Sequence, residues 1–452
     1  MQPIDREALF AQARQAIVDI GGKGVVAIAL TWVDNSGVTR VKGIPLARIG
    51  QAARWGVGAS PVFDTFLYDD STVMGRYSGG PVGDLRLHPD LSRLTALAAQ
   101  PGWAWAPADR YDQEGAPHPL DARALVRREA SRLAERGLTV KAAFEVEWCV
   151  SSDPSDEFVP ATTGPAYGMT RLVELSDYVT DVLNALTAED ITVHQIHPEY
   201  AAGQFEVSVG TEDPVGAADT AVLVRETIRA VSVRRGLRAT FAPKVLADGV
   251  GNGGHVHLSL WGESRNLMSG GTGPYGLTLE GESFAGGILS RLPALLAFGA
   301  PSVASYLRLI PSHWAGAYAC WGLENREAAL RYIAGTAGNR AQEANLEVKC
   351  FDGAANPYLA LAGLLCAGRA GLDESAALPE PIEVDPATLD GGVPRLPSAL
   401  EEAVSALLAE PVFAEALGVE LVDTVAAVRR GEIAALGGLE PAEIAARTRW
   451  RY

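Results

Sequence analysis

Cysteine is scarce in this chain of 452 residues, which carries only four. None of them has metal-binding or redox spacing, and all lie in apolar or strand-like stretches: Cys149, Cys320, Cys350 and Cys366. A secreted domain held together by disulfides is therefore disfavoured. We expect reduced thiols and a cytoplasmic protein.

Positive charge and long apolar runs are also lacking. Lysine and arginine total 38 against 55 acidic residues, and the resulting net charge of −17 disfavours nucleic acid or an anionic membrane as partner. The segment 1–10 is charged and amphipathic, unlike a signal peptide. The apolar run at 359–366 is too short, and too interrupted by glycine, to span a bilayer. We expect neither a nucleic acid nor a membrane partner.

The rest of the composition, 48% apolar and 21% charged, is that of an ordinary globular protein. The chain is longer than one typical domain. Its stretch 101–119, which contains proline and glycine, marks a boundary between a small β-rich domain at 1–108 and a large second domain at 109–452. Local signals predict an α+β fold with a hairpin turn at Asp34–Gly37, helices near 5–20, 124–136, 174–188 and 358–371, and loops at 267–282 and 374–397.

Carboxylates stand on strand-like segments where charge has no structural reason to be. In Lys141–Val150 the alternation of a strand puts Glu145 and Glu147 on one face and apolar side chains on the other. Three further segments show the same anomaly: Glu199 with Glu206, His255 with His257 and Ser259, and Glu347.

Each of these features has an ordinary explanation when taken alone. A single Glu-x-Glu is commonly the solvated face of an antiparallel strand, and a lone histidine such as His255 is commonly a satisfied core residue. Together, five glutamates and one histidine on apolar strands are costly unless cations accompany them. Divalent metal ions with oxygen ligands and one imidazole satisfy that requirement.

Six segments in chain order resemble the glutamine synthetase superfamily, and the likeness runs through nearly the whole chain. They read AFEVEW at 143–148, HPEYAAGQFEV at 197–207, GNGGHVHLSLW at 251–261, RLIP at 308–311, WGLENREAALR at 321–331 and LEVKCFDGAANPYL at 346–359. The resemblance implies a β-grasp N-terminal domain before a catalytic domain built on an antiparallel, barrel-like sheet. It also implies double rings, of which a dodecamer is our expectation, with active sites between subunits. Members activate a carboxylic acid with ATP as an acyl phosphate, which an amine then attacks.

The family's functional residues carry over position by position. One Mg²⁺ or Mn²⁺ site corresponds to Glu147, Glu199 and Glu206, and a second to Glu145, His255 and Glu347. Two hard cations of this kind neutralise charge on a transferring phosphoryl group. The resemblance places His257, Ser259 and Arg331 at the nucleotide, Arg326 and Arg331 at the reacting phosphate, and Arg308, Gly251, Lys349 and Tyr167 at the substrates.

The amine site departs from the ammonia-using pattern. An N-terminal aspartate that reaches the neighbouring subunit's ammonium site is replaced at Val57, although a second N-terminal aspartate, assigned to catalysis, is kept as Asp84. The flap glutamate expected six residues after Arg308 is Trp314. Either other acids serve, or the pocket has become apolar and suits an organic primary amine.

The acid site departs too, at Val250, where the family has asparagine or a similar residue, and at Lys349, where it has arginine. Glutamate remains the expected acid because Arg308 and Gly251 persist. We therefore expect an ATP-dependent γ-glutamyl-amine ligase. The alternatives are an ammonia-using glutamine synthetase, the same chemistry on another acid, and a catalytically silent ring-forming protein.

Overall fold

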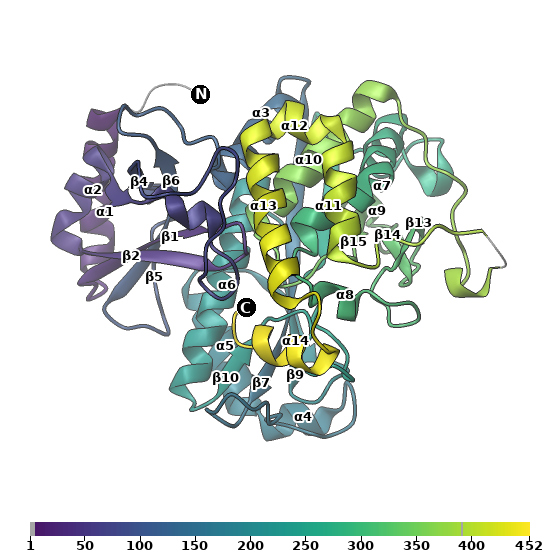
Figure 1. Cartoon of the computed structure of the whole chain (residues 1–452), viewed down its shortest axis with the longest axis horizontal. Helices are drawn as coiled ribbons and strands as arrows, with labels where there is room; N and C mark the ends of the chain where they lie inside the picture. The colour runs from purple at the N-terminus through teal and green to yellow at the C-terminus, as the bar shows by residue number, and fades with distance from the viewer. Residues whose placement is uncertain (1–4, 390–391) are drawn as a thin grey trace.

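The computed structural model describes residues 5–389 and 392–452. Figure 1 shows a small N-terminal part on the left of a larger body. Within the described residues, no helix has the length and apolar character needed to cross a membrane. The four cysteines are buried, free thiols.

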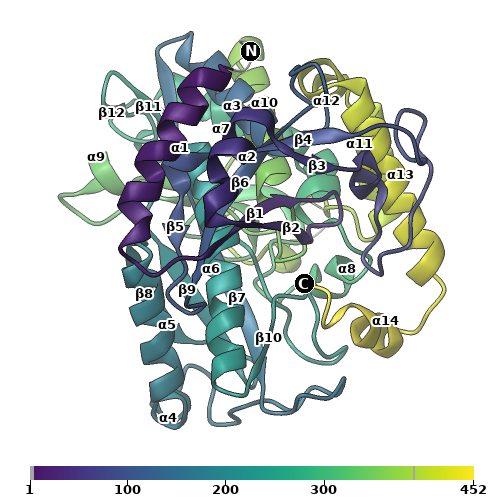
Figure 2. The same cartoon turned by 90° about the vertical axis from the view of Figure 1, so that its left-hand side faces the viewer.

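The N-terminal part is a mixed sheet in the order β2-β1-β6-β4-β3, with β5 paired to β6. Its strands are β1 (Ala27–Val33), β2 (Thr39–Pro45), β3 (Val57–Ala59), β4 (Leu85–Pro89), β5 (Thr95–Ala96) and β6 (Trp103–Tyr111). Helices α1 (Arg6–Gly21) and α2 (Ile49–Trp55) bury Ile20 and Ile49 against this sheet, and Figure 2 shows them in front of it. The parallel pairing of β1 with β6 gives this small β domain its mixed topology.

The domain boundary that we predicted at residue 108 falls inside β6. Pairing of Arg86 with Tyr111 keeps that strand in the N-terminal sheet to its last residue. We therefore propose a boundary after β6, before α3 (Ala122–Ala134).

A second, larger sheet runs in the order β13-β14-β15-β11-β7-β9-β8, with β10 on β7 and β12 on β11. Its strands are β7 (Leu138–Ser151), β8 (Val193–Pro198), β9 (Gln204–Val209), β10 (Arg238–Thr240), β11 (Val256–Gly262), β12 (Arg265–Asn266), β13 (Tyr318–Leu323), β14 (Ala328–Ile333) and β15 (Asn345–Val348). The expected antiparallel sheet is confirmed, apart from the parallel pair β13 and β14.

Helices cover the sheet and extend the core. They are α4 (Met169–Glu174), α5 (Ser176–Ala188), α6 (Pro214–Arg234), α7 (Leu279–Gly299), α8 (Ser305–Arg308), α9 (Arg340–Glu343), α10 (Pro357–Glu374), α11 (Leu400–Ala409), α12 (Pro411–Leu417), α13 (Val419–Leu436) and α14 (Pro441–Thr448). The helix predicted at 174–188 is broken at Leu175 into α4 and α5. The segment 267–282 is not simply a surface loop, because Leu267 and Leu277 are buried and α7 begins at Leu279.

The N-terminal hairpin docks directly onto the start of α10. Asn356, which caps α10, donates its side-chain amide to the carbonyls of Val33 and Asp34, at 3.1 Å each. Gly37 ends the turn with φ +80°, and a Cβ there would lie 1.9 Å from the carbonyl oxygen of Ala354. The turn therefore requires glycine both for its backbone conformation and for the close approach of the two domains.

We expect Gly37→Ala to lower the free energy of unfolding by about 2–4 kcal/mol, because it adds a steric overlap to an unfavourable positive φ. Gly24→Ala is the matched control. Gly24 also has a positive φ, +72°, but no atom lies within 4 Å of its Cβ position, so the expected loss is only about 1 kcal/mol. Urea denaturation of both variants measures the difference, and equal losses would show that the hairpin does not depend on this contact.

Candidate active site

The inner face of the large sheet lines a cavity of about 940 Å³. Side chains from six strands reach it, together with the flap between α8 and β13. All six predicted metal ligands are among its lining residues: Glu145, Glu147, Glu199, Glu206, His255 and Glu347. The structure thus brings together side chains that are up to 202 positions apart (347 − 145).

Strand register explains the convergence. On β7, Glu147 pairs directly with Glu206 of β9. On the other side of β7 lies β11, whose His257 pairs with Glu347 of β15. Since side chains directly opposite one another share a face of a sheet, four strands place their acids and imidazoles in one row.

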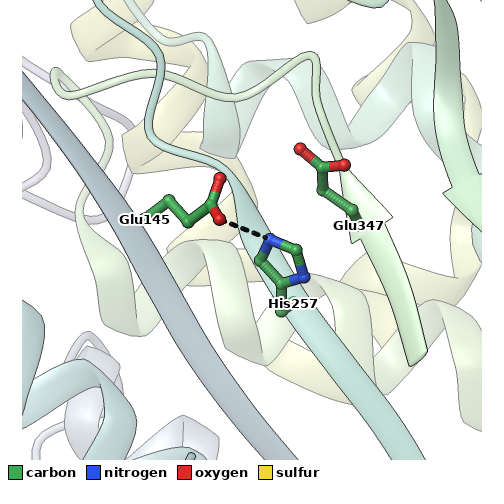
Figure 3. Close-up of side chains that lie close together, drawn as sticks. All are labelled: Glu145, His257 and Glu347. Carbon is green, nitrogen blue, oxygen red and sulfur yellow. Dashed lines mark ion pairs between the residues drawn. The ribbon is translucent and has the colours of Figure 1, made fainter. Parts of the chain in front are cut away.

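The side chains form three compact groups. Each could offer ligand atoms that lie within 4.8 Å of one another: Glu145 with His257 and Glu347, Glu145 with Glu206 and His255, and His197 with Glu199 and Glu206. Figure 3 shows the first group, in which Glu145, His257 and Glu347 point toward one another from neighbouring strands. Carboxylate oxygens with one imidazole per group fit a hard or borderline divalent cation.

These groups differ from the two sets expected from the sequence. His257, which we assigned to the nucleotide, lies 3.3 Å from Glu145 in the first group. Glu147 belongs to none of the three. Its Oε2 accepts hydrogen bonds from Gln204 Nε2 at 2.9 Å and from the Gly253 amide at 2.8 Å, and its Oε1 lies 3.8 Å from His255 Nε2. The role of all six residues as ligands stays a prediction.

Burial and neighbouring charges set the pKa values of these carboxylates. Burial would raise the pKa of Glu145, but hydrogen bonds from His255 and His257 outweigh it and hold that pKa well below its ordinary value. Burial also opposes ionisation of Glu347, yet the charges of Lys349 and the two histidines lower its pKa to about 2. For Glu206, burial and repulsion from neighbouring glutamates raise the pKa to about 7, against the hydrogen bond from His197. A cation beside Glu206 would reverse that repulsion.

The basic residues expected at the substrates also reach the cavity. Arg308 is buried and donates to the carbonyl of Lys349 at 3.0 Å, while its Nη1 has no hydrogen-bond partner within 5–389 and 392–452. Arg331 donates to Glu347 at 2.9 Å, and Arg326 is exposed at the cavity wall. A buried guanidinium nitrogen without a partner is suited to a carboxylate ligand.

Three predicted residues do not line the cavity: Ser259, Val57 and Asp84. Ser259 lies further along β11, where its hydroxyl accepts a hydrogen bond from Trp261 Nε1 at 2.8 Å. Val57 on β3 and Asp84 before β4 belong to the N-terminal sheet, and Asp84 accepts from Gln113 at 2.8 Å. The remaining predicted positions, Gly251, Lys349, Tyr167 and Trp314, all line the cavity.

Sequence reasoning missed several residues of the site, and two of them act directly on the predicted metal ligands. His197 lies 3.3 Å from Glu206, and their hydrogen bond raises its pKa to about 9. Gln204 is fully buried and ties Glu147 to the carbonyl of Gly251 at 3.0 Å. Strand alternation could have found Gln204, because it stands two positions before Glu206.

Known proteins match this sequence and this fold. The family model for the glutamine synthetase catalytic domain matches residues 119–445. The chain is 58% identical to the gamma-glutamylpolyamine synthetase GlnA3 of Streptomyces coelicolor, over 96% of this chain and 95% of that protein. It is 29% identical to the glutamate–methylamine ligase of Methyloversatilis universalis, over 86% and 89%.

A solved structure described as a novel glutamine synthase homolog superimposes with a TM-score of 0.85 at 32% identity, covering 95% of this chain and 99% of the other. The likeness therefore includes the N-terminal β domain and the large antiparallel sheet. The chain belongs to the glutamine synthetase family.

Proposed function

We propose that this protein is an ATP-dependent ligase that joins the γ-carboxylate of glutamate to a primary amine of a polyamine, releasing ADP and phosphate. The observation that carries the proposal is the 58% identity, over 96% of the chain, to a gamma-glutamylpolyamine synthetase. The chemistry of the residues that line the cavity supports the same proposal.

The acid-rich floor of the cavity suits two divalent cations, Mg²⁺ or Mn²⁺. The group of His197, Glu199 and Glu206 would hold one, and Glu145 with His257 and Glu347 would hold the other. Bound there, such cations neutralise charge on the transferring phosphoryl group. Gln204 fixes the orientation of Glu147 beside these groups.

The cationic wall suits the acid and the phosphate. The unpartnered Nη1 of Arg308 would bind the α-carboxylate of glutamate beside Gly251 and Lys349. Arg326 and Arg331 would hold the phosphate, since a planar guanidinium matches phosphoryl oxygens. Val250 and Lys349 both line the cavity, so the departures noted in the sequence lie within it rather than in a remote region.

Aromatic side chains line part of the cavity. Trp314, Tyr167 and Tyr200 are among its lining residues, with 56%, 50% and 58% of their surfaces exposed, and we assign them to the amine. Aromatic faces attract ammonium groups and contact methylenes. A polyamine offers both, whereas ammonium offers no methylene. These rings support a polyamine rather than ammonia as the acceptor.

The assembly and location of the protein stay predictions. Val57 and Asp84 lie outside the cavity of their own chain, which is compatible with the proposed ring in which the N-terminal domain of one subunit completes the site of the next. A dodecamer is our expectation. The buried free thiols agree with the expected cytoplasmic location.

Amine selectivity tests the proposal. With ATP, Mg²⁺ and glutamate, we expect phosphate release to be faster with putrescine or spermidine than with ammonium. Two or three buried methylenes at about 0.8 kcal/mol each give roughly a 15- to 60-fold preference in kcat/KM. The double variant Trp314→Glu with Val57→Asp should move preference back toward ammonium. Equal use of ammonium and every organic amine by the unmodified protein would replace this function with glutamine synthesis.

Cation binding is tested separately with Glu147→Ala. We expect Mn²⁺ affinity, followed by calorimetry, to fall roughly 10- to 100-fold, because loss of a carboxylate beside the metal groups weakens the site. ATP turnover should be lost while subunit assembly and melting temperature are kept. Asp181→Ala, on the surface of α5, serves as control. Unchanged Mn²⁺ affinity in Glu147→Ala would show that Glu147, whose Oε2 is held by Gln204 and Gly253, does not support the cation groups.

A further inference from the structure

The flap that carries Trp314 has an unusual backbone. We define the flap as Leu309–Gly316, the connection from α8 to β13. Its tip, Ser312–Trp314, is exposed, and both Ser312 and Trp314 have positive φ angles, 59° and 53°. Non-glycine residues adopt this conformation at a cost, so the surrounding structure must hold the tip in place.

A buried carboxylate beneath the flap provides such a hold. Glu327, directly before β14, is only 6% exposed, and its Oε1 accepts a hydrogen bond from the backbone N–H of Trp314 at 2.8 Å. Its second oxygen has no partner among the residues that the structure describes. Burial accordingly raises the pKa of Glu327. Burying a carboxylate costs free energy unless a hydrogen bond compensates it, and here the backbone N–H of the flap donates that hydrogen bond.

Glu327 is itself fixed from the opposite side. The side-chain oxygen of Asn325 accepts from the Glu327 amide at 3.0 Å. The Asn325 side chain then donates to the carbonyls of Ile382 and Val384, at 2.8 and 3.0 Å. A continuous chain of hydrogen bonds therefore runs from the segment 382–384, through Asn325 and Glu327, to the backbone of Trp314.

We propose that Glu327 is a positioning residue for amine recognition: by holding the Trp314 backbone, it sets the indole against the cavity where the amine chain binds. The inference rests on the proposed ligase function. The carboxylate acts through the flap and does not touch the amine, since Glu327 does not line the cavity. Amine specificity is then divided between an aromatic side chain that touches the substrate and an acid that fixes its orientation.

Two substitutions separate the hydrogen bond from the charge. Glu327→Gln keeps an acceptor for the Trp314 N–H but removes the charge, whereas Glu327→Ala removes both. In Glu327→Ala we expect the KM for putrescine to rise about tenfold, equivalent to ~1.4 kcal/mol, with the KM for ATP within twofold of the unmodified value. Glu327→Gln should stay within about threefold for putrescine. A rise in Glu327→Gln as large as in Glu327→Ala would overturn the positioning role.

Glu189→Ala is the matched control for losing a buried carboxylate. Glu189 is 5% exposed and accepts from the Ala98 amide at 2.9 Å, but it lies outside the cavity. Its substitution should lower the melting temperature to a similar degree without changing the selectivity among amines. A rise in putrescine KM equal to that of Glu327→Ala would assign the effect to general destabilisation and overturn the inference.

Hydrogen–deuterium exchange tests the contact without catalysis. Peptides covering 309–316 should exchange at least about fivefold faster in Glu327→Ala than in the unmodified protein, because the Trp314 amide loses its acceptor. Glu327→Gln should remain near the unmodified rate. Unchanged exchange in Glu327→Ala would overturn the inference even if putrescine proves a good substrate. Absence of putrescine turnover in the unmodified protein, with faster flap exchange in Glu327→Ala, would instead overturn the proposed function.

Discussion

Mutual repulsion among carboxylates is the constraint on which the rest of this structure depends. Glu147 stands opposite Glu206 on adjacent strands, and nearby glutamates and burial raise the pKa of Glu206 to about 7. Such a row is held together only if the opposite face of the sheet contributes enough apolar burial. Phe144, Trp148 and Phe205 provide it. Aromatic side chains of this size bury about 150–250 Å², on the order of 4–6 kcal/mol each.

The same strands therefore carry both the stability and the chemistry. Trp148 stacks on Phe205 with ring centroids 5.8 Å apart and donates to the hydroxyl of Tyr178 at 2.9 Å. These contacts fix β7 against β9 and α5, and with them the separation of the glutamates on the inner face. A rigid sheet is what keeps repelling groups at ligand distance until a cation joins them.

How much of the site the sequence could predict depends on the distance over which each rule acts. The period of two within β7 was enough to place Glu145 and Glu147 on one face, because alternation is local. Alternation also put Ser259 on the face of His255. The rule does not say how far along a strand the cavity extends. Ser259 stands four residues after His255, at about 3.3 Å per residue, and therefore lies beyond the cavity.

The sequence did not predict the register between strands that are far apart along the chain. The pairing of His257 with Glu347, which brings that histidine into an acidic group instead of leaving it at the nucleotide alone, follows from packing β11 beside β15. We propose to move the domain boundary from 108 for a related reason. Proline and glycine at 101–119 suggested a linker, whereas the pairing partners of β6 extend the N-terminal sheet to Tyr111.

The proposed function gives the two ends of the cavity opposite electrostatic tasks. At the phosphate end, anions must be brought together, and this requires cations and arginines in fixed positions. At the amine end, a cation must bind and then lose its proton, because only the free base attacks an acyl phosphate. A carboxylate at that end would favour the protonated form of the amine. Ammonium needs such a carboxylate in order to bind, because it has no carbon chain that could make apolar contacts. An aromatic ring such as Trp314 would contact the proposed amine chain in either protonation state, so binding and deprotonation would not oppose each other. On this proposal, an amine with several methylenes is held where ammonium is not.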